Sequence, residues 1–200
     1  MKRVVLLLFV VFTFIGGYTA NANDLALSKE ARYTETPGFG KYRLASGVGR
    51  VNYWISSSAQ TIKGGITEAA NNWVVTGWGY NPIYMYETTS SSNSHMDIYY
   101  NNLPAGINGQ TQFYYIKSGV HSGVSPYSSN WHYGVITLSK TAFTGMGYVD
   151  QIGVIGHEMD HVYGLDHNNF NSRSIMCQAG SGRAVYKPGL PDHYGINNLY

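Results

Sequence analysis

Three histidines and one glutamate between positions 157 and 167 have the residue types and the spacing of a metal site. His157 and His161 are four residues apart, so on a helix they lie on one face, about 6 Å apart, and offer nitrogen atoms to one ion. Glu158 lies roughly 100° around the helix from His157, where a carboxylate can hold a water beside the ion. Gly164 permits a sharp left-handed turn that brings His167 back to the same ion. Three neutral nitrogens and a water describe a catalytic zinc site with an open fourth position.

The pattern His-Glu-x-x-His-x-x-Gly-x-x-His at 157–167 resembles the extended zinc signature of the metzincin metallopeptidases. Members of this family also have a methionine turn beneath the zinc, shortly after the third histidine. Met176 follows the third histidine by nine residues, a spacing close to that of the matrixin branch. A methionine on its own would be interpreted as core filler. The resemblance implies that the three histidines bind one catalytic Zn²⁺ and that Glu158 is the general base.

The resemblance implies a secreted zinc endopeptidase that hydrolyses peptide bonds of an extended peptide or protein substrate. Zinc would lower the pKa of its water towards about 7 and polarise the scissile carbonyl. Glu158 would take the proton of the water and pass it to the leaving amine. Two alternatives stay open. One is a secreted binding or adhesion module with a vestigial zinc site, and the other is a zinc amidase of cell-wall peptides. The intact Glu158 is evidence against the first alternative.

The first 22 residues have the composition of a secretory signal peptide. Lys2 and Arg3 give a positive start, residues 4–15 form an almost unbroken apolar run, and residues 20–22 are a small-x-small cleavage site. The run is too short to cross a bilayer, which needs about 20 apolar residues. We expect export through a Sec-type signal, cleavage after Ala22 and an extracellular location.

The composition of the exported chain gives no reason to expect a charged partner. Removal of the signal leaves 11 of the 13 basic residues against 11 acidic residues, so neither nucleic acid nor an anionic membrane is expected to bind. Only 12% of the residues are charged, against roughly 25% in typical domains. Cys177 is the sole cysteine, so no internal disulfide can form, and we interpret it as a small buried residue. We expect a monomer whose partner is its substrate.

Two hundred residues are enough for one domain with a sizeable core. Residues 23–48 mix charges, Pro37 and several glycines without periodicity, which indicates an N-terminal extension, either a loose arm or a short propeptide. Residues 49–200 are expected to form the metzincin-like catalytic domain. Many matrixins are kept latent by a propeptide cysteine on the zinc, and this extension has none. A carboxylate such as Asp24 is a hypothetical substitute.

The pattern that begins at residue 51 predicts an α+β fold. Apolar residues at helical spacing indicate an amphipathic helix at 61–73. Five strands are expected at 51–55, 83–87, 96–100, 111–116 and 132–138. This order resembles the metzincin catalytic domain, with a twisted mixed five-stranded sheet, a backing helix, a zinc helix and a small C-terminal subdomain that ends in a helix. In that fold the strand at 111–116 is an exposed edge over the cleft, where a peptide can pair through its main chain.

The elements that carry the site are expected close to the motif. The zinc helix should run over 151–163, with Asp150 as its N-cap. Asp160 and Asp166 flank the histidines, and we interpret them as solvent-facing rather than as groups that orient the ligands. Residues 190–200 resemble the closing helix of matrixins.

The chain departs from the matrixin pattern after Met176. Gln178 and Gly180 stand where matrixins usually have a proline and a tyrosine of the pocket wall, and Tyr186 is a candidate substitute wall. The His/Asp-rich segment that binds structural zinc and calcium in vertebrate matrixins is missing from 101–135, so accessory Ca²⁺ has no support. The other histidines are interpreted as surface or partly buried residues rather than ligands: His95, His121, His132 and His193.

Overall fold

A six-stranded mixed sheet forms the centre of the computed structural model, which describes residues 35–200. The predicted signal peptide 1–22 and residues 23–34 of the predicted extension lie outside the described residues. The strands are β1 (Val51–Ile55), β2 (Met85–Thr88), β3 (Met96–Asn101), β4 (Gly109–Lys117), β5 (Val120–Val124) and β6 (Tyr133–Ser139). Their order is β2-β1-β3-β6-β4-β5, in which β4 runs antiparallel to both of its neighbours and the other pairs are parallel.

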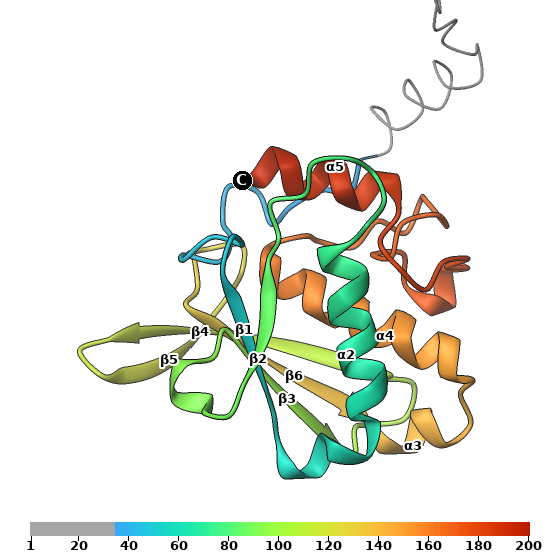
Figure 1. Ribbon diagram of the computed structural model, residues 1–200, viewed down its shortest axis with the longest axis horizontal. Helices are drawn as coiled ribbons and strands as arrows, with labels where there is room; N and C mark the ends of the chain where they lie inside the picture. Colours follow the sequence, from blue (N-terminus) through green and yellow to red (C-terminus); the bar gives the residue numbers. More distant parts are fainter. Residues whose placement is uncertain (1–34) are drawn as a thin grey trace, which may run out of the picture.

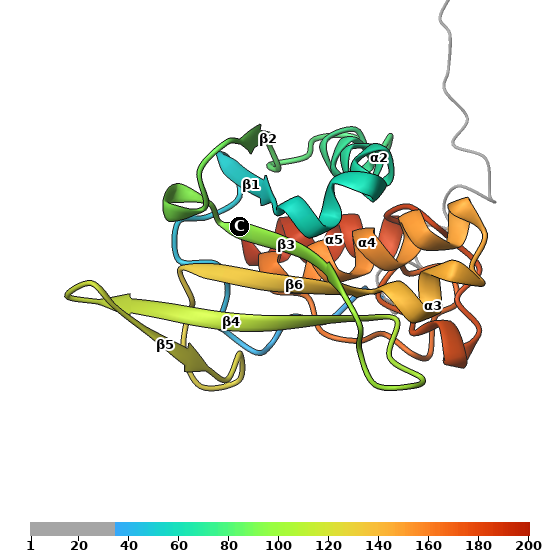
Figure 2. The ribbon, with the colours of Figure 1, turned by 90° about the horizontal axis from the view of Figure 1, so that it is seen from below.

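Four α-helices among the described residues complete this mixed α+β fold, as the residue pattern predicted. They are α2 (Lys63–Val74), α3 (Lys140–Thr144), α4 (Tyr148–Tyr163) and α5 (Leu190–Leu199), with 3₁₀ turns η1 (Ser57–Ile62), η2 (Ser91–Asn93) and η3 (Ala179–Ser181). Helices α2 and α4 pack against each other on one side of the sheet, and α5 crosses the top of the molecule (Figures 1 and 2). Among the described helices, none has the length and apolar character needed to span a membrane.

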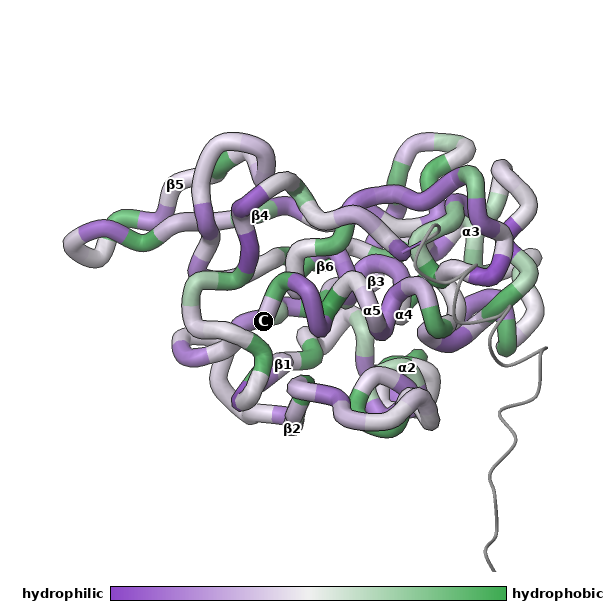
Figure 3. The backbone as a smooth tube through the Cα atoms, turned by 90° about the horizontal axis from the view of Figure 1, so that it is seen from above, coloured by the Kyte–Doolittle hydropathy of each residue, from purple (hydrophilic) through white to green (hydrophobic). Residues whose placement is uncertain are grey.

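The sixth strand, β5, was not expected, and it changes the edge of the sheet. Its residues Val-His-Ser-Gly-Val are almost all exposed, so the sequence lacks the alternating apolar pattern that would predict a strand. It pairs with Phe113–Lys117 of β4 in a hairpin that projects from the body and along which hydrophobic and hydrophilic residues alternate (Figures 1 and 3). The prediction that 111–116 is an exposed edge is therefore wrong for its second half, residues 113–116, which pair with β5. Only Gly109–Gln112 of β4 lacks a neighbour on that side among the described strands.

Helix α4 lies unusually close to the sheet and is buried along most of its length. A Cβ atom on Gly134 of β6 would lie 2.5 Å from a methyl group of Val162, so glycine is what lets the helix approach. Two tryptophans attach the helix to its neighbours through their indole N–H groups. The indole of Trp73 donates to the carbonyl of Gly156 (3.0 Å) and that of Trp131 to the carbonyl of Val162 (2.8 Å). The position of α4, which carries the histidine motif, is therefore set by packing on two elements.

Helix α4, the predicted zinc helix, begins earlier than the sequence indicated. It starts at Tyr148 with Gly147 as its N-cap, so Asp150 lies in the first turn and is not the cap. A carboxylate in the first turn is still favourable, because it faces the positive end of the helix dipole. The backing helix α2, in contrast, begins later than predicted, at Lys63 after a 3₁₀ turn rather than at residue 61.

The described part of the predicted extension, from Thr36 onwards, packs into the domain and is not a loose arm. Phe39 and Leu44 are buried in the core. The backbone N–H of Phe39 donates to the carbonyl of Gly164 (3.0 Å), and that of Asp166 donates to the carbonyl of residue 37 (2.7 Å). The chain from Thr36 therefore borders the turn that follows helix α4, a role that its irregular composition did not reveal.

Candidate metal centre

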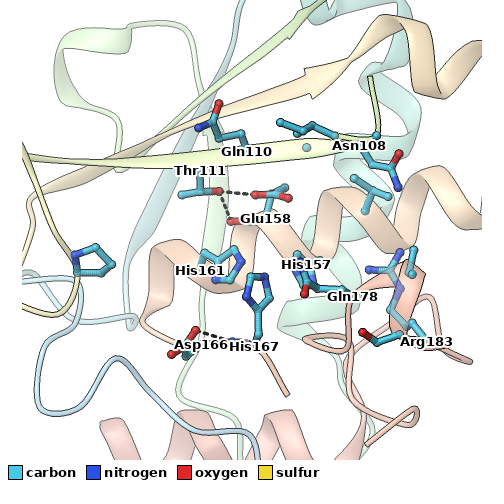
Figure 4. A pocket seen from close by; sticks show the side chains of 18 of the residues that line it. Asn108, Gln110, Thr111, His157, Glu158, His161, Asp166, His167, Gln178 and Arg183 are labelled. Atoms are coloured by element: carbon cyan, nitrogen blue, oxygen red, sulfur yellow. Dashed lines mark hydrogen bonds between the residues drawn. The ribbon is translucent and has the colours of Figure 1, made fainter. Parts of the chain in front are cut away.

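Helix α4 and the turn after it bring the three predicted histidines together. His157 and His161 lie one turn apart on the same face of α4, and His167 approaches them from the segment beyond the helix (Figure 4). Their ring centroids are 4.8 Å apart for 157–161, 5.2 Å for 157–167 and 4.8 Å for 161–167. The potential ligand atoms all lie within 4.8 Å of one another, close enough to hold one metal ion. Two of the rings are buried and that of His167 is exposed.

The turn that returns His167 depends on a glycine, as predicted. Gly164 ends α4 with a φ of 129°, a conformation that residues with a side chain rarely adopt. A Cβ there would also lie 3.2 Å from the Cβ of Arg43. The backbone N–H groups of Gly164 and Leu165 both donate to the carbonyl of Asp160, at 3.1 and 3.2 Å, which closes the helix end. Conformation and space both require glycine here.

Backbone carbonyls select the ring nitrogens that face the centre. Nδ1 of His157 lies 2.8 Å from the carbonyl oxygen of Ile175, and Nδ1 of His161 lies 2.9 Å from that of Leu165. A carbonyl only accepts, so each Nδ1 carries the proton and each Nε2 keeps a free lone pair. This is the arrangement that metal-binding histidines show. The residues present therefore fit a metal ion.

The two buried imidazoles are also held in the neutral form that a metal ligand needs. Burial lowers the pKa of His161 to about 4 and lowers the pKa of His157 well below its usual value. The neighbouring histidines add to the effect, because a second positive charge nearby is unfavourable. His167, whose ring is exposed, has a lowered pKa for the same first reason, partial loss of solvent.

Glu158 is buried beside the histidines and is held by strand β4. The hydroxyl of Thr111 lies 2.8 Å from its Oε2 atom and 3.0 Å from its carbonyl oxygen, and donates to them (Figure 4). A Cβ on Gly109 would lie 2.7 Å from Cγ of Glu158, so the side chain packs directly on the strand. Burial raises the pKa of Glu158 to about 7, against the opposing effects of the Thr111 hydrogen bond and the charge of Arg183. Sequence reasoning missed both β4 residues, because 47 positions separate Thr111 from Glu158.

Asp192, at the start of α5, anchors the segment beneath His157. Its buried carboxylate accepts hydrogen bonds from the backbone N–H of Ile175 (2.8 Å), from the hydroxyl of Thr36 (2.6 Å) and from the hydroxyl of Ser174. The same Ile175 provides the carbonyl that orients His157. The carboxylate therefore supports a ligand that it does not touch, and no local sequence signal connects the two.

The predicted methionine turn lies between this anchor and the third histidine. Met176 is fully buried, and its carbonyl accepts a hydrogen bond from the backbone N–H of Asn168 (3.0 Å), the residue after His167. Cys177 is buried next to it, as expected, and burial raises the pKa of its thiol. A protonated, enclosed thiol has little nucleophilic character.

The two aspartates that flank the histidines behave differently, and the prediction for one of them was wrong. Asp160 is 0% exposed rather than solvent-facing, and neither carboxylate oxygen has a hydrogen-bond partner among the described residues. Burial raises its pKa well above the usual value, and the nearby Asp192 raises it further. Asp166 is half-buried, and its carboxylate accepts from the backbone N–H of His167 and from the hydroxyl of Tyr127, each at 2.7 Å.

The histidines and Glu158 open onto a cleft of about 520 Å³. Its walls are the start of β4, helix α4 and the segment Gln178–Arg183. Tyr186 is not among the lining residues, so it does not form the wall that the sequence suggested. The remaining histidines lie elsewhere, each with a polar partner of its own: His95, His121, His132 and His193. In the part of the chain that the structure describes, the triad is the only cluster of three or more metal-binding side chains.

Comparison with known proteins adds little to this geometry. No family model matches the chain, and neither does any curated protein. Among solved structures, the structure of myroilysin matches with a TM-score of 0.36 and 12% sequence identity. The match covers 70% of this chain and 54% of that chain, so this chain spans about half the length of the other protein. A similarity this weak carries no information on activity, and the site's own geometry has to support a function.

Proposed function

We propose that this chain is a zinc-dependent endopeptidase of the metzincin type, which hydrolyses peptide bonds in extended peptides or proteins. One observation carries the proposal. Two buried imidazoles have their Nδ1 atoms bonded to carbonyls, which leaves two Nε2 atoms and a third histidine around one point, with the carboxylate of Glu158 beside it. All four groups lie in an open cleft that a substrate can reach. Two neutral ring nitrogens on one helix face are a donor set that suits zinc.

Zinc bound to the three histidines would lower the pKa of a water towards about 7 and polarise the carbonyl of the scissile bond. Glu158 accepts the proton of the attacking water and transfers it to the nitrogen of the leaving amine. Thr111 keeps the carboxylate in place during both transfers, because its hydroxyl donates to Oε2. Burial supports the same role, since a carboxyl with a pKa of about 7 both takes and gives a proton near neutral pH.

The free edge at Gly109–Gln112 is the proposed binding site for the substrate main chain. This half of β4 borders the cleft and has no neighbouring strand on one side among the described residues. An extended peptide can add to such an edge through main-chain hydrogen bonds, which bind without regard to sequence.

Export and a monomeric state are part of the proposal. The positive start, the apolar run and the small-x-small site in residues 1–22 support secretion through a signal peptide. The near balance of charge after its removal supports a peptide partner rather than nucleic acid or a membrane surface.

The test is Glu158→Gln in the purified protein, with zinc quantified in the same samples. The amide keeps the shape of the side chain and cannot take up a proton, so we expect about one zinc per chain and a loss of peptide cleavage of about a hundredfold or more. A chelator should abolish cleavage by the wild type. Glu68→Gln, at an exposed glutamate of α2 that accepts from Tyr148, is the matched control and should remain active. Bound zinc without cleavage of any peptide would contradict the proposal.

A further inference from the structure

Arg183 is held at one end of the cleft by the geometry of its loop. The loop turns through η3 and through Gly182, which has a φ of 88°, and the backbone N–H of Ala184 then donates to the carbonyl of Ser172 (2.8 Å). The arginine therefore lies between a tight turn and a fixed backbone contact. Its side chain lines the same cleft as the three histidines (Figure 4).

The guanidinium of Arg183 rests on helix α4 at a glycine. A Cβ atom on Gly153 would lie 3.2 Å from an Nη atom and 3.5 Å from Cζ of the arginine, so any larger residue would displace it. Gly153 is one helical turn before His157, which places the positive charge next to the metal ligands. The side chain is therefore kept in position rather than free to move in solvent.

Among residues 35–200, this guanidinium has no ionic partner. The only ion pair within 4.0 Å among the described residues joins Lys63 and Glu87, and no hydrogen bond from Arg183 occurs there. Asp150 and Glu158 attract its charge from further away, while burial lowers its pKa. A half-buried cation that is removed from water and left unpaired is unfavourable unless a ligand completes it.

We infer that Arg183 selects substrates by binding a carboxylate, presented by the residues that follow the scissile bond. A guanidinium offers a planar pair of N–H donors that matches a carboxylate, and the contact is strongest where water is partly excluded. This inference rests on the proposed function, because it assigns a substrate preference to the same cleft. An uncharged side chain at that position would leave the guanidinium unpaired.

The direction of the substrate depends on how it pairs with β4, and we take the antiparallel sense, which is the commoner one for strand pairs. In Figure 4, Asn108 lies at the end of the cleft nearest Arg183, and Gln110 and Thr111 lie further along β4, away from it. A peptide that pairs antiparallel to Gly109–Gln112 runs the opposite way. Its C-terminal half therefore lies beside Arg183. The carboxylate can be an aspartate or glutamate side chain or the terminal carboxylate of a short peptide, since the chemistry is the same.

The experiment compares peptides that differ by one group. Peptides with an amidated C-terminus carry Glu or Gln directly after the cleaved bond, and a third, shortened peptide carries Gln and a free terminal carboxylate near that position. For the wild type we expect kcat/KM to be about tenfold or more higher for a carboxylate peptide than for the amidated Gln peptide. Preference for the Glu peptide identifies the side chain as the source, and preference for the shortened peptide identifies the chain terminus.

Substitutions of Arg183 test whether this residue causes the preference. Arg183→Gln should reduce the ratio to about twofold or less, and Arg183→Lys should retain part of it, because the charge remains and the paired donors are lost. Arg50→Gln is the matched control, since Arg50 is exposed and lies over the ring of Tyr86, outside the cleft. The control should keep the wild-type ratio.

A binding measurement separates this inference from the proposed function. Titration calorimetry of the same peptides with the Glu158→Gln protein reports recognition without turnover. The inference predicts that a carboxylate peptide binds more tightly than the amidated Gln peptide, and that adding Arg183→Gln to the Glu158→Gln protein abolishes this difference. Such a result supports the inference even if the wild type cleaves no peptide. Absence of cleavage would contradict only the proposed function. Equal binding of all three peptides, or a preference that persists in the folded Arg183→Gln protein, would overturn the inference.

Discussion

Single backbone carbonyls prepare individual residues of this site for a metal. Ile175 and Leu165 each hold the Nδ1 proton of one histidine, so the orientation and the tautomer of the ring are set before any ion binds. Burial then keeps both rings neutral. The exception is Asp160, a carboxylate that is equally buried and has no partner among the described residues. The site therefore combines well-satisfied ligands with one unfavourable neighbour.

The isolated carboxylate predicts a pH-dependent effect of Asp160→Asn. Burial raises the pKa of Asp160 in the folded state, so the folded chain keeps a proton that the unfolded chain releases above about pH 3.8. The contribution of Asp160 to stability should therefore fall as the pH rises above this value, and the variant should lack that fall. Urea unfolding at several pH values should show that the free energy of unfolding of the variant increases relative to that of the wild type between pH 4 and pH 8. A difference that stays constant with pH would show that Asp160 is ionised in the folded chain.

At the scale of elements, the contact between β4 and α4 creates the environment of Glu158. The strand contributes a hydroxyl from Thr111 and an open space at Gly109, and the helix contributes the carboxylate that uses both. The free half of the same strand borders the cleft. One strand is thus expected to position both the general base and the substrate.

Gly109→Ala should damage catalysis without removing the metal. The new Cβ would lie 2.7 Å from Cγ and 2.8 Å from Oε1 of Glu158, which forces the carboxylate away from Thr111. We expect kcat/KM to fall by about tenfold or more, with zinc content unchanged because no histidine is touched. Gly123→Ala is the control, since a Cβ there meets nothing within 4 Å. Equal activity of the two variants would show that the packing on Gly109 is not required.

At the scale of the whole molecule, one carboxylate joins three distant parts of the chain. Asp192 in α5 binds Thr36 near the start of the described chain and Ser174 and Ile175 beneath the histidines. Tyr200 adds a second connection, because its hydroxyl donates to the carbonyl of Tyr163 at the end of α4. The closing helix therefore supports the site from below, although none of its residues lines the cleft.

Asp192→Asn should weaken both the fold and the metal site. An amide nitrogen cannot accept the hydrogen bonds that converge on one carboxylate oxygen, so we expect the free energy of unfolding to fall by about 3 kcal/mol. Zinc affinity should fall by about tenfold or more, because Ile175 orients His157. Denaturant titration and competition with a zinc-binding dye measure the two effects. Glu87→Gln, which removes an exposed ion pair, should change stability by about 1 kcal/mol or less, and a similar result for Asp192→Asn would contradict this role.

Regular local patterns predicted the main elements well. The strand at 51–55 has the predicted limits, and the helix around the histidines and the closing helix are present. Errors arose where a residue's environment comes from elsewhere in the chain. Strand β5 has no buried face of its own, and Asp160 was expected in solvent because the segments that cover it are distant in sequence. The segment from Thr36, which packs into the domain, was expected to belong to a loose arm or a short propeptide for the same reason.

The sequence by itself determined the candidate ligands, the helix that carries two of them and the need for glycine at the turn. These features depend on spacings of three or four residues, which the helix repeat converts directly into geometry. Tertiary structure alone decided which carbonyls orient the rings, that Thr111 holds Glu158, and that Arg183 lies unpaired in the cleft. Tertiary contacts can join residues that are far apart in the sequence, as between Thr36 and Asp192, which are 156 positions apart, and no local periodicity encodes them. They exist only once packing has brought strand, helix and loop together.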